Sequence, residues 1–208
     1  LSDNLPTYCI LLPMRNEPPP VSDKLFENLN KLNYPKSKLD IVILIDEDDD
    51  YKDYYSKVSL PNHYRIEIAE DCFPKTKPKV CNMGLYSTNA EYVVIYDAED
   101  NPDPNQLLKA LHKFKDSTVE CVQCQLHYSN KYPSMISRFF NLEYLLHWRI
   151  MSWGIKRMQG KIAVVPLGGT SQHLRTSTLK ELGGWDSYNV TEDCDLGIKL
   201  SRMKKSIV

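Results

Sequence analysis

The chain has 208 residues, 42% of them hydrophobic and 25% charged, which is an ordinary composition for a soluble globular protein. Its length suits one substantial hydrophobic core, and its formal net charge of -1 gives no general attraction to nucleic acid, so we expect one domain without a nucleic-acid partner. No apolar run approaches the roughly 18 residues that span a bilayer, and the first residues lack the basic flank and cleavage site of a signal peptide.

Strand-like apolar runs and helical patterns alternate along the first half of the chain. Strands are predicted at residues 8–12, 39–45, 64–69 and 92–96, and helices at about 22–32, 80–88 and 104–115. Ser22 is the predicted N-cap of the first helix, and residues 51–63 form a polar, helical or irregular connection. This alternation predicts an α/β fold with a βαβ-type, mostly parallel sheet.

The second half begins with a predicted strand at residues 119–128 and a long aromatic helix at 134–157. Because the apolar residues of that helix surround much of its circumference, we expect it to pack in the core, with a partner or a membrane surface as alternatives. A short helix at 177–182 ends at Gly183 and Gly184, and a last helix starts near Thr191.

Six cysteines are scattered along the sequence, and only Cys121 and Cys124 lie close together. The pair lies in the strand predicted at 119–128, where positions three apart point to opposite faces. The two thiols therefore cannot easily share a metal, and we expect all six cysteines to be reduced thiols in a reducing compartment.

Three acids, Asp97, Glu99 and Asp100, follow directly after the strand predicted at 92–96. Ligands of open α/β sheets bind beyond the carboxyl ends of the strands. Carboxylates gathered there suit Mg²⁺ or Mn²⁺ carrying a phosphate-bearing substrate. The alternative is an acidic turn that only leads into a helix.

A second strand also ends in acids, beginning with Asp46, and a parallel sheet would bring it beside Asp97. Lys77, in a loop of several lysines, could face a phosphate, although a solvated basic loop is the simpler alternative. The patterns of the P-loop and of classical dinucleotide-binding enzymes are absent from the sequence, which argues against both classes.

The last acidic cluster is Thr191-Glu192-Asp193-Cys-Asp195. Thr191 can cap the final helix, and acids favour the positive end of its dipole. In the functional interpretation one of these acids is a general base that deprotonates a hydroxyl.

Seven short motifs occur in a fixed order: Pro13-x-x-Asn16-Glu17, Asp46, Lys77 with Asn82, Asp97-Ala-Glu99, Gly168-Gly-Thr170, Gly183-Gly-Trp-Asp186 and Thr191-Glu-Asp193. This set resembles family 2 glycosyltransferases, in particular the processive, membrane-embedded branch of cellulose, chitin and hyaluronan synthases, over residues 8–203. The resemblance implies a GT-A fold, which is Rossmann-like with a mixed, mostly parallel sheet flanked by helices. It also implies a nucleotide-diphospho-sugar donor, a divalent metal and inversion at the anomeric carbon.

Site residues carry over by their match to these motifs. Asp193 corresponds to the catalytic base, and Asp97 and Glu99 to the metal ligands. The donor-binding set is Pro13, Asn16, Glu17, Asp46, Lys77 and Asp97. The acceptor-binding set is Gly168, Gly169, Thr170, Trp185 and Glu192. Trp185 could stack on a sugar ring or follow a helix stop as a core residue. Residues 1–103 would form the nucleotide-sugar half of the domain and residues 104–208 the acceptor half.

The sequence departs from the family pattern in three places. The metal motif reads Asp97-Ala-Glu99, so either Glu99 or Asp100 could be the main ligand beside Asp97. The first acidic motif reads Asp46-Glu-Asp48, which leaves Asp46 the preferred residue. The chain reaches Val208 without the Q-x-x-R-W motif or transmembrane helices of the processive branch. We therefore expect a soluble segment of a longer, membrane-attached protein, on the cytoplasmic side of the membrane.

The sequence thus predicts an inverting glycosyltransferase that moves a sugar from a UDP-sugar to a hydroxyl of a glycan acceptor with Mg²⁺ or Mn²⁺, in polysaccharide synthesis. One alternative is a sugar-nucleotide nucleotidyltransferase, although such enzymes carry a Gly-rich loop where this chain has Pro13-Met-Arg-Asn-Glu-Pro18. Another alternative is a non-catalytic module that binds a nucleotide sugar.

Overall fold

The computed structural model describes residues 4–127, 134–158 and 164–208. Within these residues, seven strands form one mixed sheet in the order β3-β2-β1-β4-β6-β5-β7. The strands are β1 (Tyr8–Met14), β2 (Leu39–Asp46), β3 (Tyr64–Ala69), β4 (Tyr92–Ile95), β5 (Val119–Gln123), β6 (Gln172–Arg175) and β7 (Ser206–Ile207). The four strands from β3 to β4 are parallel, and β6 is antiparallel to both of its neighbours. The predicted fold class is confirmed.

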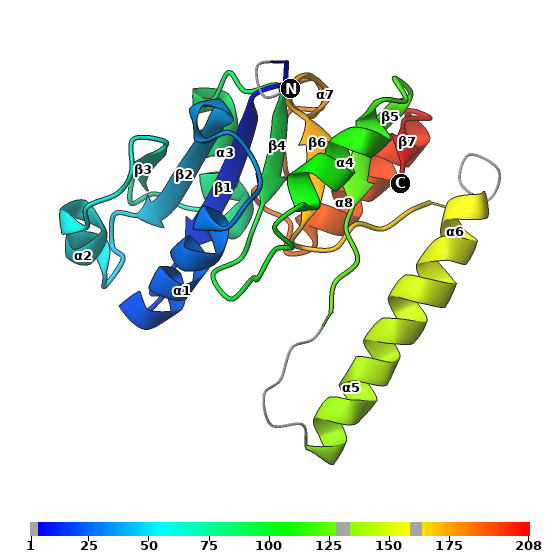
Figure 1. Cartoon of the computed structure of the whole chain (residues 1–208), viewed down its shortest axis with the longest axis horizontal. Helices are drawn as coiled ribbons and strands as arrows, with labels where there is room; N and C mark the ends of the chain where they lie inside the picture. The colour runs from blue at the N-terminus through cyan, green and yellow to red at the C-terminus, as the bar shows by residue number, and fades with distance from the viewer. Residues whose placement is uncertain (1–3, 128–133, 159–163) are drawn as a thin grey trace.

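Helices cover both faces of the sheet (Figure 1). They are α1 (Pro19–Asn30), the 3-10 turn η1 (Lys36–Lys38), α2 (Lys52–Lys57), α3 (Lys77–Ser87), α4 (Gln106–Phe114), α5 (Met135–Leu146), the π-helical turn η2 (His147–Met151), α6 (Ser152–Met158), α7 (Thr176–Glu181) and α8 (Glu192–Arg202). α1 and α4 pack on one face, and α3, α7 and α8 pack on the other.

The interior strand β1, which lies between β2 and β4, explains this layering. Successive side chains of a strand point to opposite faces. Ile10 and Leu12 belong to the core under α1 and α4, whereas Cys9 and Leu11 belong to the core under α3 and α8. Its uninterrupted apolar sequence is therefore typical of a parallel strand that is buried on both sides.

The predicted start of the first helix is wrong. α1 begins at Pro19, with Pro18 at the N-cap position, and Ser22 lies inside the helix and is fully buried. The Ser22 hydroxyl donates to the carbonyl of Pro19 over 3.1 Å instead of capping the helix. Proline suits the first helical turn because an N–H there would have no intrahelical acceptor, so its absence costs no hydrogen bond. This preference outweighed the capping signal of Ser22.

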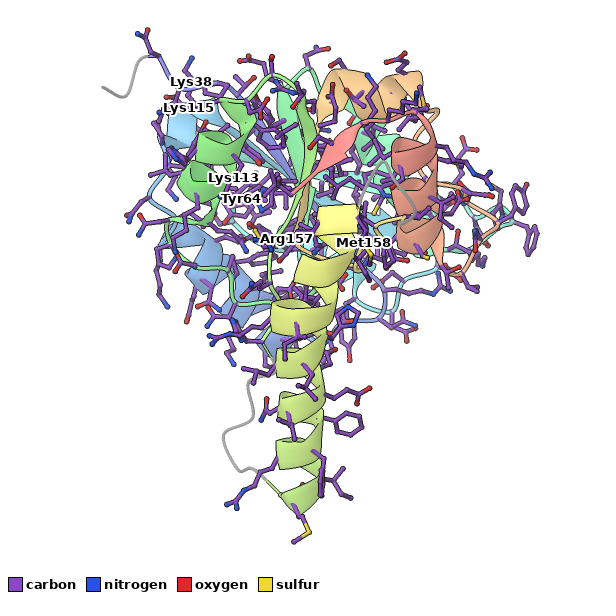
Figure 2. The ribbon with its side chains drawn as sticks, turned by 90° about the vertical axis from the view of Figure 1, so that its right-hand side faces the viewer. Lys38, Tyr64, Lys113, Lys115, Arg157 and Met158 are labelled. Carbon is purple, nitrogen blue, oxygen red and sulfur yellow. The ribbon has the colours of Figure 1, made fainter. Side chains whose placement is uncertain are left out.

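The aromatic helix predicted at residues 134–157 is present as α5, η2 and α6, but its expected place in the core is wrong. Met135, Phe139 and Ile150 are 77%, 66% and 61% exposed. The helix extends away from the body (Figures 1 and 2), and Arg157 and Met158 lie at its body-facing end in Figure 2. In the described parts of the chain, no helix is long and apolar enough to cross a membrane.

Two short strands, β6 and β7, were not predicted. The strand predicted at 119–128 ends at Gln123, and its predicted last residue, Tyr128, lies outside the described residues.

Cys121 is buried and Cys124 is half-buried, and the six cysteines are free thiols.

Candidate active site

A cavity of about 200 Å³ opens at the carboxyl ends of the parallel strands β1, β2 and β4. Six predicted site residues line it: Pro13, Glu17, Asp46, Lys77, Asp97 and Glu99. A larger hollow of about 370 Å³ lies at the other end of β4 and contains none of the predicted site residues. Its Arg175 and Lys180 are engaged with backbone carbonyls of their own chain. We therefore place the candidate site in the smaller, acidic cavity.

Lys77 begins α3 and bonds to two segments that are distant in sequence. Its ammonium donates to the carboxylate of Asp97 and, over 2.8 Å, to the carbonyl of Gly169. Burial lowers the pKa of Lys77, but the contact with Asp97 outweighs this effect and raises the pKa above its ordinary value. Lys77 thus joins the end of β4 to the loop before β6.

Negative charge at Asp97 is only partly compensated by Lys77. Burial raises the pKa of the Asp97 carboxyl, and the charges of Glu99 and Asp193 add to that rise against the effect of Lys77. A second positive charge would therefore be favourable here.

Asp46 ends β2 and is only 4% exposed. Its Oδ2 accepts from the guanidinium of Arg15 over 2.5 Å, while its Oδ1 has no partner among the described residues. Sequence reasoning missed Arg15, although it lies inside the Pro13-x-x-Asn16-Glu17 motif and is the one basic residue of that loop. The unpartnered oxygen of Asp46 can accept an N–H or O–H from a ligand.

Glu99 and Asp100, which the sequence left as alternatives, have different surroundings. Asp100 Oδ2 accepts from the backbone N–H of Asp97 over 2.8 Å and from the hydroxyl of Thr170. Its carboxylate therefore holds the turn together, whereas Glu99 lines the cavity.

Asn16 lies beside the cavity and fixes the loop that follows β1. It adopts a positive φ of 54°, its N–H donates to Asp49 Oδ2 over 2.7 Å, and its side-chain oxygen accepts from the N–H of Asp50 over 3.0 Å. These contacts tie the loop after β1 to the loop after β2. The next residue, Glu17, faces the cavity, and burial together with the charge of Glu99 raises the pKa of its carboxyl.

The predicted base, Asp193, lies in the first turn of α8, and like Lys77 it lies close to Gly169. The Oδ2 atom of Asp193 is 3.6 Å from the position that a Cβ would take on Gly169. Its Oδ1 accepts from the N–H of Cys194 over 2.7 Å. Burial raises the pKa of the neighbouring Glu192 carboxyl, with a further rise from Asp193. Thr191 stands at the N-cap position without a side-chain capping bond.

The acceptor-side segment Gly168–Thr170 is fixed by its own contacts. Gly168 donates its N–H to Gln123 over 2.9 Å, and Thr170 is buried at 8% exposure. The segment therefore presents the backbone of Gly169 toward Asp193 and Lys77.

Trp185 does not lie on an open surface where a sugar could stack. It is 3% exposed and belongs to the core between the sheet, α3 and α8, which corrects its assignment to the acceptor-binding set. The backbone N–H of Trp185 donates to the side-chain oxygen of Asn82, and the backbone carbonyl of Trp185 accepts from the side-chain NH2 of Asn82. These two bonds hold the turn against α3. The ring is buried because removing a large apolar side chain from water is favourable.

No group of three or more metal-ligating side chains is placed to hold an ion within residues 4–127, 134–158 and 164–208. A protein cage of that kind is unnecessary for Mg²⁺, which commonly keeps water ligands and binds one or two carboxylates together with substrate phosphates. Asp97 and Glu99 supply hard oxygen donors in an acidic, incompletely neutralised cavity, so the residues fit a divalent ion that arrives with a diphosphate.

Comparisons with known proteins identify relatives of this chain. The chain is 27% identical over 201 residues to a probable glycosyltransferase, YdaM, of Bacillus subtilis, covering 94% of this chain and 47% of the relative. It is 23% identical over 202 residues to a beta-monoglucosyldiacylglycerol synthase of Trichormus variabilis, covering 96% of this chain and 42% of the relative. The chain thus spans about half the length of the curated relatives it matches.

Solved structures share the fold. A mannosyltransferase from Pyrobaculum calidifontis in complex with GDP-Man and Mn²⁺ superposes with a TM-score of 0.73 at 19% identity, over all of this chain and 55% of that one. TarS 1–349 of S. aureus in complex with UDP-GlcNAc has a TM-score of 0.64 at 16% identity, over 94% of this chain and 54% of that one. These likenesses establish the GT-A fold. The family model described as glycosyltransferase like family 2 matches residues 6–208, and the chain belongs to that family.

Proposed function

We propose that this domain transfers a sugar, with inversion and with the help of a divalent metal, from a UDP-sugar to a hydroxyl of a glycan or glycolipid acceptor. The observation that carries the proposal is the position of Lys77 between Asp97 and Gly169, with Asp193 beside that glycine. Three groups therefore lie close together near the carboxyl end of β4: Asp97 as a candidate metal ligand, Lys77 as a cation for a phosphate, and Asp193 as a candidate base.

The donor would lie in the cavity that Asp46, Lys77 and Asp97 line. The free Oδ1 of Asp46 would accept a hydrogen bond from the base or ribose, and Lys77 would face the diphosphate. A divalent ion held by Asp97 and Glu99 would neutralise charge that develops on the leaving diphosphate. The structurally similar proteins were solved with two different donors, one with GDP-Man and one with UDP-GlcNAc. The choice of uridine as the base in this chain is therefore itself part of the proposal.

Asp193 would act as the general base. The acceptor oxygen attacks the anomeric carbon from the face opposite the diphosphate, the bond from that carbon to the phosphate oxygen breaks, and the acceptor proton passes to the Asp193 carboxylate. Gly169 leaves room for this exchange, since it presents no side chain between Asp193 and Lys77.

The longer protein that the relatives' lengths suggest would, in this proposal, work at a membrane in glycan or glycolipid synthesis. Nucleotidyl transfer is less well supported, because the loop after β1 carries Glu17 in the cavity where a nucleoside triphosphate would need additional positive charge.

The base assignment can be tested by measuring UDP released from UDP-glucose and from UDP-N-acetylglucosamine with Mn²⁺ and a hydroxyl acceptor. We expect Asp193→Asn to lower turnover by about 10² to 10⁴-fold with UDP affinity nearly unchanged. The matched control is Asp195→Asn, two residues along α8, whose carboxylate pairs with Lys199 at 2.7 Å. Equal activity in wild type and Asp193→Asn would contradict the assignment.

A further inference from the structure

The helical segment formed by α5, η2 and α6, residues 135–158, carries an apolar stripe on α5 that faces solvent. Met135, Phe139, Leu142 and Leu146 follow one another at spacings of four, three and four residues, which places them on one side of a helix. Their exposed fractions are 77%, 66%, 51% and 43%. Soluble monomers rarely leave such a patch uncovered, so the stripe indicates an interaction surface.

The charge of the same segment points to the partner. It contains four basic residues, Arg138, Arg149, Lys156 and Arg157, against one acid, Glu143, which gives a net charge of +3. Because the whole chain carries -1, the remaining residues together carry -4. Apolar and aromatic side chains combined with arginine and lysine are typical of helices that lie in the interface of a bilayer with anionic lipids.

A second copy of the chain fits the segment less well. Two such helices would bring like charges together at the contact. The π-helical turn η2 also interrupts the regular helical period that a long helix pair requires.

The segment is connected to the candidate site at its body-facing part. The ring of Trp148 lies 3.3 Å from the position that a Cβ would take on Gly168, at the start of the acceptor-side loop. A surface that binds this segment would therefore lie close to the place where the acceptor is proposed to enter.

We propose that residues 135–158 lie on an anionic lipid bilayer, with the stripe of Met135, Phe139, Leu142 and Leu146 immersed in the interface. The negative remainder of the chain would be repelled from the same surface, which orients the body away from the lipid. For the acceptor, and resting on the proposed function, the site would then favour a hydroxyl presented at the bilayer surface.

The test is co-sedimentation of the 208-residue chain with vesicles of phosphatidylcholine alone or with about one third phosphatidylglycerol, a measurement that needs no transferase activity. We expect the chain to partition at least roughly tenfold more strongly onto the vesicles with phosphatidylglycerol than onto those of phosphatidylcholine alone. The variant Phe139→Ser, Leu142→Ser, which changes two members of the stripe, should lose about tenfold or more of that partitioning. The variant Arg138→Gln, Arg149→Gln should lose the preference for anionic lipid.

The matched control is Phe73→Ser, Tyr188→Ser, which removes two other exposed rings, 83% and 73% exposed, from the body. It should bind vesicles like the wild type. All six side chains changed in these three variants are exposed. Circular dichroism checks that each variant is folded. Absence of vesicle binding by the wild type, or equal losses in the control, would overturn the proposal. So would a dimer in light scattering that the variant Phe139→Ser, Leu142→Ser dissociates while vesicles fail to bind.

Discussion

The ammonium of Lys77 donates both to the carboxylate of Asp97 and to the carbonyl of Gly169. One side chain thereby connects three parts of the candidate site: the first turn of α3, the carboxyl end of β4 and the loop before β6. The arrangement explains how Lys77 and Gly169, which are 92 positions apart in the sequence, come together beside the cavity that Lys77 lines.

Replacing Lys77 by methionine should weaken UDP binding at least about tenfold, because a charged hydrogen bond to a phosphate is lost and Asp97 is left among acids. Calorimetric titration measures the effect. Lys79→Met is the matched control, since the Lys79 ammonium bonds only to backbone carbonyls of Glu70 and Cys72 among the contacts described for it. Equal losses in both variants would indicate a general charge effect.

Glu99 and Asp100 should separate binding from stability. Glu99→Gln should weaken Mn²⁺-dependent UDP binding and leave the melting temperature nearly unchanged. Asp100→Ala should lower the free energy of unfolding by about 1–3 kcal/mol, because the N–H of Asp97 and the hydroxyl of Thr170 lose their acceptor. Calorimetry and thermal denaturation of both variants check this, and the reverse pattern would make Asp100 the metal ligand.

Gly197 allows α8 to approach the segment before β6 closely. A Cβ at this position would lie 2.2 Å from the carbonyl oxygen of Val165 and 3.0 Å from the N–H nitrogen of Leu167. Gly197→Ala should therefore destabilise the fold by roughly 1–3 kcal/mol, a fall in melting temperature of about 2–4 °C per kcal/mol. Gly154→Ala, where a Cβ meets nothing within 4 Å, is the control and should be neutral or stabilising.

His173 should make stability depend on pH. It is fully buried, its Nδ1 is 2.6 Å from the hydroxyl of Tyr8, and burial lowers its pKa to about 3. Because the unfolded chain binds a proton below about pH 6.5 and the folded chain does not, this residue lowers the free energy of unfolding by about 1.4 kcal/mol per pH unit as the pH falls from there toward 3.

His173→Gln keeps a polar partner for Tyr8 and removes this titration. Urea denaturation at about pH 7 and about pH 5 should show a smaller loss of stability in the variant than in the wild type. An identical pH dependence in the two proteins would mean that His173 does not contribute as described.

The sequence predicted the parallel part of the sheet well, because β1 is apolar throughout, β2 contains the apolar run Ile41–Ile45, and both strands are followed by loops with polar residues. It did not predict β6, because three of the four residues of Gln172–Arg175 are polar or charged. That strand is held between β4 and β5, and His173 is buried there through its contact with Tyr8. Tertiary pairing of this kind leaves no local pattern.

The candidate site was predicted in part. Acids at strand ends indicated Asp46 and Asp97, and both line the cavity. Spacing could not reveal that Arg15 covers Asp46, nor that Asp100 turns back to the backbone, because these contacts depend on loop geometry. The exposure of Phe139 was also hidden, since an apolar helix looks the same in sequence whether it faces a core or another surface.

The most direct test of the central claim is a calorimetric titration of UDP into the chain with Mn²⁺ and with EDTA, in wild type and in Asp97→Asn, Glu99→Gln. Asp103→Asn is the control, because that carboxylate lies outside the cavity and pairs with Lys109 at 3.0 Å. We predict Mn²⁺-dependent binding that the control retains and the double variant loses by at least about tenfold. UDP affinity that is the same in EDTA and in the folded double variant would contradict a metal-assisted donor site at Asp97 and Glu99.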